Sequence, residues 1–93
     1  MLDVNEYFNG KVKSISLQTA ALPATVGVMT PGEYTFTTDC KEIIDIVSGE
    51  LDVQLPGCDW VTYAEGQVFE VEAQQSFHLK VNRDVAYLCK YVR

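Results

Sequence analysis

The stretch EGQVFEVEAQQSFHLKVN, residues 65–82, decides the fold because its apolar side chains recur at every second position. A period of two is typical of β-strands, in which successive side chains point to opposite faces of a sheet. The first strand places Phe69 and Val71 on one face. The second places its apolar side chains at positions 77, 79 and 81 on one face and its polar ones on the other, namely Ser76, His78 and Lys80.

The same alternation fills the rest of the chain, in segments such as TVGVM, EYTFT, LDVQL and VAYLCKYV. Residues typical of turns, namely Gly, Pro, Asn and Asp, separate these segments. About nine short strands in this arrangement indicate a β-sandwich or a closed barrel. No window keeps the spacing of an amphipathic helix. We therefore expect an all-β single domain over residues 1–93.

Two local features near the N-terminus need their own interpretation. In KVKSISL the apolar positions change phase near Lys13 and Ser14, which predicts a β-bulge. Tyr7 and Phe8 precede the first clear strand, and we interpret them as lid or dimer residues without a chemical role.

Composition limits the classes of partner. The 93 residues carry a formal net charge of −6, from 13 acidic and 7 basic side chains. Proteins that bind nucleic acid or anionic membranes are normally basic, so we expect neither partner. Cys40, Cys58 and Cys89 are odd in number and far apart, which argues against disulfides and favours the reducing cytoplasm. No secretory signal precedes them, and prolines interrupt the one long uncharged run, residues 14–32.

Glycine spacings give a more specific clue. Glu42 is followed after six residues by Gly49, and Gly66 precedes His78 by twelve residues. These two segments resemble the paired motifs of the cupins, small β-barrels of jelly-roll type, although the spacing to His78 is one residue longer than usual. Where the resemblance would place the His-x-His pair of the first motif, the chain has Phe36 and Thr38. Only Glu42 and His78 have counterparts among the usual four metal ligands, so we expect neither a metal nor another cofactor.

A longer resemblance covers nearly the whole chain. The blocks NEYFNGKVKSI, VGVMTPGEYTF, VSGELDVQLP, DWVTYAEGQVFEV, SFHLKV and YLCKYV are similar to the small single-domain cupins of the pyrimidine/purine nucleoside phosphorylase family. That resemblance implies a jelly-roll barrel that forms a homodimer. It also implies phosphorolysis of purine and pyrimidine nucleosides to free base and ribose 1-phosphate, with phosphate as co-substrate.

Phosphorolysis needs a cationic cradle for phosphate, a polar group for the ribose and a proton donor for the leaving base. We expect His78 to act as the acid and Glu42 to steady the ribose. Lys80, on the strand face of His78, is the candidate for phosphate. We expect the three to meet in an open barrel mouth, His78 facing the cavity and Glu42 opposite. Three further residues are expected to line the cavity or contact the base, namely Tyr34, Phe36 and Thr38.

Two other function classes fit the same residues. One is a non-enzymatic cupin that binds a small molecule and has lost its metal chemistry. The other is a metal-independent sugar isomerase or epimerase that uses His78 as its base. Phosphate-dependent release of free base from uridine and adenosine would distinguish the phosphorylase from both.

Overall fold

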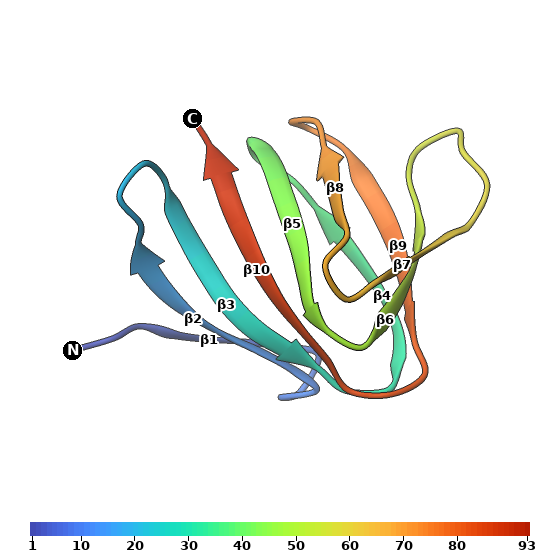
Figure 1. The fold of residues 1–93 in the computed structure, drawn as a ribbon, viewed down its shortest axis with the longest axis horizontal. Coiled ribbons are helices and arrows are strands. Elements are labelled where there is room, and N and C mark those ends of the chain that lie inside the picture. The colour runs from blue at the N-terminus through green and yellow to red at the C-terminus, as the bar shows by residue number, and fades with distance from the viewer.

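The computed structural model describes residues 1–93 and contains ten strands and no helix, which confirms the all-β prediction (Figure 1). No helix is present that could cross a membrane. The strands are β1 (Val4–Tyr7), β2 (Val12–Gln18), β3 (Pro23–Met29), β4 (Gly32–Thr37), β5 (Lys41–Ser48), β6 (Glu50–Gln54), β7 (Val61–Ala64), β8 (Val68–Val71), β9 (Ser76–Val81) and β10 (Val85–Val92).

These strands form two antiparallel sheets that face each other (Figure 1). The larger sheet has six strands in the order β1-β2-β3-β10-β5-β8, and the smaller has four in the order β4-β9-β6-β7. Consecutive strands lie in different sheets at several points, for example β3 and β4, so the chain repeatedly crosses between the layers. One end of the sandwich gathers the start of β3, the end of β10 and the starts of β5 and β9 (Figure 1).

The core lies between the two sheets and contains 15 buried side chains. Strand β9 shows why these residues form it. Phe77, Leu79 and Val81 are buried, while the alternating positions Ser76, His78 and Lys80 are exposed. The two-residue period therefore assigns the faces of β9 correctly: its apolar side points into the molecule.

Two predictions near the N-terminus are wrong. Tyr7, expected to precede the first strand, is the last residue of β1, which pairs with β2 from Val4↔Ile15 to Tyr7↔Val12. The bulge predicted near Lys13 and Ser14 does not form, because β2 pairs with β3 without a register shift along its whole length. The phase change has another cause: Ile15 lies on the outer face of the sheet, and Ser14 is buried on the inner face.

Gly49, the last residue of the E-x6-G spacing, has a clear structural reason to be glycine. Its φ of +90° belongs to the region that L side chains rarely adopt, and a Cβ there would lie 2.8 Å from the carbonyl oxygen of Asp84. The residue forms the tight turn between β5 and β6, which carries the chain from the larger sheet to the smaller one. The spacing thus fixes the end of the strand that carries Glu42.

Candidate functional site

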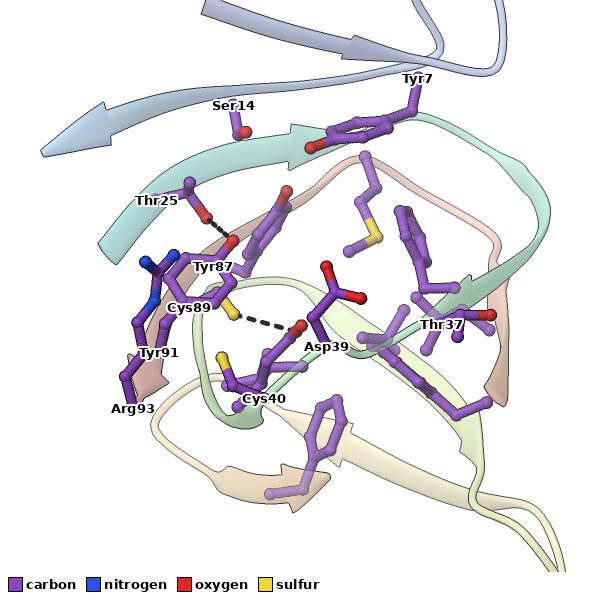
Figure 2. A pocket seen from close by; sticks show the side chains of 18 residues that line it. Tyr7, Ser14, Thr25, Thr37, Asp39, Cys40, Tyr87, Cys89, Tyr91 and Arg93 are labelled. Carbon is purple, nitrogen blue, oxygen red and sulfur yellow. Dashed lines mark hydrogen bonds between the residues drawn. The ribbon is translucent and has the colours of Figure 1, made fainter. Parts of the chain in front are cut away.

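A cavity of about 340 Å³ opens between the sheets at the end of the sandwich where β10 finishes and β5 begins. Its size falls within the range of about 300–1,000 Å³ that is typical of small-molecule sites. Both sheets and the connection from β4 to β5 contribute to its lining (Figure 2). The two walls differ sharply in chemistry.

The wall formed by the smaller sheet is aromatic and aliphatic. The rings of Phe36 on β4 and Phe77 on β9 stack with centroids 6.1 Å apart and an interplanar angle of 29°. Leu51 and Leu79 extend this surface, and Phe69, from β8 at the edge of the larger sheet, adds a further ring. An apolar surface of this kind can hold a planar ring by stacking.

The wall formed by the larger sheet carries hydroxyl groups. Ser14 on β2, Thr25 on β3, and Tyr87 and Tyr91 on β10 all line the cavity (Figure 2). The hydroxyls of Thr25 and Tyr91 lie 3.0 Å apart and hydrogen-bond to each other. The ring of Tyr87 fits because its neighbour across the strands is Gly27, where a Cβ would lie 2.5 Å from the tyrosine Cζ.

Glu42 is the central polar group of the cavity. It points inward from β5, opposite Tyr91 on β10, and the Cys89 thiol donates a hydrogen bond to its Oε1 over 3.3 Å. Burial raises the pKa of Glu42, and the nearby Asp39 carboxylate adds to the increase. Burial also raises the pKa of the Cys89 thiol and of the Tyr91 phenol, so both stay protonated. The raised pKa means that Glu42 holds a proton more readily than an exposed carboxylate does.

Charges in the cavity are few. Asp39 and Glu42 supply the carboxylates, and Arg93, next to Tyr91 in Figure 2, supplies the one cationic side chain of the lining. Tyr7, from the unexpected strand β1, also lines the cavity, and its ring packs edge-on against Phe36 at 5.8 Å. Sequence reasoning missed Asp39 and Tyr7, because neither belongs to a motif and only the folded chain brings them together.

The expectation that His78 and Lys80 share this cavity with Glu42 is wrong. Both side chains lie on the outer face of the smaller sheet. There the hydroxyl of Thr35 lies 2.9 Å from Nδ1 of His78, and Nζ of Lys80 lies 4.4 Å above the ring of Trp60.

The extra residue in the second cupin-like motif explains the error. A shift of one residue along a strand moves a side chain to the opposite face of its sheet. Phe77 therefore occupies the inward position where the shorter spacing would place a histidine. Because the cavity lies between the sheets, it adjoins the apolar side of β9 and not the polar side.

Of the three remaining predicted residues, one lines the cavity and two do not. Phe36 lines the cavity as expected. Thr38, expected to line it, is instead buried behind the wall and donates a hydrogen bond to the carbonyl oxygen of Glu72, 2.6 Å away. Tyr34 is buried too, and its hydroxyl donates to the carbonyl oxygen of Thr30 at 2.6 Å. Thr38 and Tyr34 thus hold connections between strands.

The cavity residues do not fit the metal centre of metal-binding cupins. Phe36 and Thr38 replace the histidine pair, and His78 points away from Glu42. No group of three or more His, Cys, Asp or Glu side chains is placed to hold a metal ion. A first-row metal needs about three or four such ligands.

Comparison with known proteins agrees with this architecture. The family model described as pyrimidine/purine nucleoside phosphorylase matches residues 2–91. A protein of that name from Saccharophagus degradans is 68% identical over the full length of both chains. A crystal structure of a protein of unknown function from Vibrio parahaemolyticus, 44% identical, superposes with a TM-score of 0.94 over 99% of each chain.

The fold extends beyond this family. An RmlC-like cupin from Shewanella frigidimarina superposes with a TM-score of 0.77 at 17% identity, covering 97% of this chain and 82% of that one. This likeness concerns the fold alone and confirms the cupin-type architecture. The match over nearly the whole sequence is more specific. The chain therefore belongs to the pyrimidine/purine nucleoside phosphorylase family.

Proposed function

We propose that the protein is a broad-specificity nucleoside phosphorylase that converts purine and pyrimidine nucleosides plus phosphate to free base and ribose 1-phosphate. The observation that carries the proposal is the two-sided cavity. An aromatic wall faces a row of hydroxyls, and the carboxyl group of Glu42 lies among them. The names of the full-length relatives support the same reaction class.

The aromatic wall accounts for tolerance of different bases. Every base has a π-face, so stacking on Phe36 and Phe77 discriminates little between purines and pyrimidines. The hydroxyls of Thr25, Tyr87 and Tyr91 can hydrogen-bond with the ribose on the other side of the cavity. The nucleoside is thereby held between an apolar surface for its base and a polar surface for its sugar.

Glu42 supplies the proton in this proposal. An oxygen of hydrogen phosphate forms a bond to C1′ of the ribose while the bond from C1′ to the base nitrogen breaks, and its electron pair stays on the base. The carboxylic acid of Glu42 protonates the leaving base. The proton of the hydrogen phosphate returns to the Glu42 carboxylate, so the enzyme ends in its starting state. The neighbouring Asp39 carboxylate can stabilise the positive charge that develops on the ribose.

The proposal gives His78 and Lys80 no chemical role, because both lie outside the cavity. An isomerase that uses His78 as its base is disfavoured for the same reason. A non-enzymatic binding protein remains the contrasting case, since an apolar cavity can also hold a ligand without turnover.

Release of free base from uridine and adenosine, measured with and without phosphate, tests the proposal. We expect release that requires phosphate and yields ribose 1-phosphate in equal amount. Glu42→Gln should lower turnover by roughly 10²–10⁴-fold, as expected for loss of a general acid. His78→Ala is the matched control and should retain activity. Binding of nucleosides without turnover under all conditions would instead identify a binding protein.

We further propose that the chain acts as a homodimer through the outer face of the larger sheet. Ile15, Leu17, Val26 and Val28 lie together there, each between 39% and 47% exposed. Lys13, which lies opposite Val28, is already paired, with its Nζ 3.1 Å from Glu6 Oε1. A face that is apolar and locally neutral suits a second copy of an otherwise acidic chain. The free thiols of Cys40, Cys58 and Cys89 fit the cytoplasm as the place of action.

A further inference from the structure

A second hollow, of about 320 Å³, adjoins the cavity beside β1, the end of β2 and the start of β3. It is more open, and it shares four lining residues with the cavity, namely Tyr7, Thr25, Tyr91 and Arg93. The end of β10 lies beside the loop that joins β2 to β3, which brings these residues to one mouth (Figure 1). A ligand in the cavity therefore lies next to whatever occupies the second hollow.

Arg93 is the one cation that lines either hollow. Several other cations are engaged elsewhere: Lys13 pairs with Glu6, Lys41 with Glu70, and Lys80 with the Trp60 ring. A chain with a net charge of −6 repels anions over most of its surface. A dianion that must approach the cavity will therefore concentrate at Arg93, whose planar guanidinium can donate two parallel hydrogen bonds to phosphate.

Neutral donors surround the same place. The amide Nδ2 of Asn5 donates to the hydroxyl oxygens of Ser14 at 3.2 Å and Ser16 at 3.1 Å. Because its oxygen acts as the acceptor, Ser16 keeps its own hydrogen to donate to a ligand. In the pair of Thr25 and Tyr91, one hydroxyl donates to the other, so one hydrogen remains free there as well. Ser16 and Thr25 line the second hollow.

We propose that this second hollow, with Arg93, Ser16 and Thr25, is the subsite that binds inorganic phosphate and positions it for attack on C1′ of the nucleoside in the cavity. The inference rests on the proposed phosphorylase function and adds the position of its second substrate. Arg93, at the mouth of the cavity, takes the phosphate-binding role expected of Lys80, which faces outward. The base then lies deep against the aromatic wall, the ribose at the mouth and phosphate beyond it.

Titration of the full-length protein with inorganic phosphate, followed by calorimetry or ³¹P NMR with and without free base, tests the subsite. Arg93→Gln should weaken phosphate binding roughly 10- to 100-fold, because it removes hydrogen bonds to a charged group. Arg83→Gln is the matched control: it removes the same charge from a turn that lines neither hollow, and it should bind phosphate as the parent does. Ser16→Ala should weaken binding roughly 2- to 10-fold.

Kinetics provide the second readout. In Arg93→Gln the KM for phosphate should rise while the KM for nucleoside stays near the parental value, and Arg93→Lys should recover part of the loss. Equal phosphate affinity in Arg93→Gln and Arg83→Gln would overturn the subsite while leaving phosphate-dependent turnover intact. Phosphate binding that depends on Arg93 without any release of base would support the subsite and overturn the proposed reaction.

Discussion

Replacement of Gly27 by alanine tests the link between the packing of the larger sheet and the shape of the cavity. The added Cβ would lie 2.5 Å from both Cζ and the hydroxyl oxygen of Tyr87. Carbon atoms in contact normally lie about 3.5–4.0 Å apart, so the ring must move by about 1 Å or more. Tyr87 is only 7% exposed and lines the cavity, which leaves the cavity as the space into which the ring can move.

Two effects of opposite sign decide the change in stability. Alanine restricts the unfolded chain more than glycine, which stabilises the fold by about 0.4–1 kcal/mol. Overpacking a filled interior costs about 1–3 kcal/mol. We expect the clash to dominate and the melting temperature to fall by roughly 5–15 °C, since about 1 kcal/mol corresponds to about 4–8 °C for a domain of this size. Nucleoside binding should weaken as well, because the displaced ring narrows the cavity.

Thermal unfolding and nucleoside titration of Gly27→Ala measure both effects. Val28→Ala, at the next position but on the exposed outer face, is the control and should change the cavity little. Adding Tyr87→Leu to Gly27→Ala should recover stability relative to the sum of the two single changes, because leucine removes the clashing ring end. A Gly27→Ala protein with parental stability and affinity would refute the argument that glycine is needed to seat Tyr87.

Four further outcomes follow from the site and the surface. Burial raises the pKa of Glu42, so the stability that its protonated form contributes is complete below the usual value of 4.5 and is lost as pH rises through the raised pKa. In denaturant unfolding measured across pH, Glu42→Gln should therefore become more stable relative to the parent as pH rises toward neutrality. A difference in stability that does not change with pH would contradict the burial of this carboxyl group. Phe77→Ala should lose about 3–5 kcal/mol of stability, whereas His78→Ala should change it by less than about 0.5 kcal/mol; the reverse order in unfolding experiments would mean that the faces of β9 are exchanged. Phosphorolysis should survive EDTA, with metal content checked by elemental analysis, and activity that returns only on adding one metal would disprove metal independence. Val26→Glu should shift the proposed dimer to monomer in analytical ultracentrifugation, and an unchanged mass would exclude this face as the interface.

The sequence was sufficient for every strand except β1 and for the faces of the most regular ones. In β9 the alternation of Phe77, Leu79 and Val81 with polar residues gives both the strand and its buried side, because each apolar side chain stabilises only when it leaves water. Glu42 in the cavity was also predictable, since Gly49 fixes the end of its strand. Both inferences depend on residues close together in sequence.

The rest of the site depends on contacts between distant segments. Arg93 and Thr25 line the same cavity only because β10 pairs with β3, and the ring of Tyr7 contacts that of Phe36 only because β1 is added to the larger sheet. Alternation says which residues of a strand share a face, but it does not say on which side of the sheet a cavity forms. His78 shows the consequence: it lies in the expected strand beside the expected neighbours, but the cavity lies on the opposite side of the sheet.

Part of the inward face of β2 and β3 is polar, although Val12 and Met29 on the same face join the core, and this local inversion connects the cavity with the outer surface. Ser14, Thr25 and Gly27 point inward, at positions where a packed sandwich would carry apolar side chains. The apolar partners of these residues, Val26 among them, consequently point outward. Where the larger sheet turns these polar and small residues inward, the apolar core is interrupted and a cavity lined with hydroxyls remains. The sheet's apolar face then needs a cover outside, and a second copy would provide it. Natural proteins depart from the usual alternation of buried apolar and exposed polar side chains mainly at functional sites. The departure in β2 and β3 accounts for both the hydroxyl-lined cavity and the proposed interface.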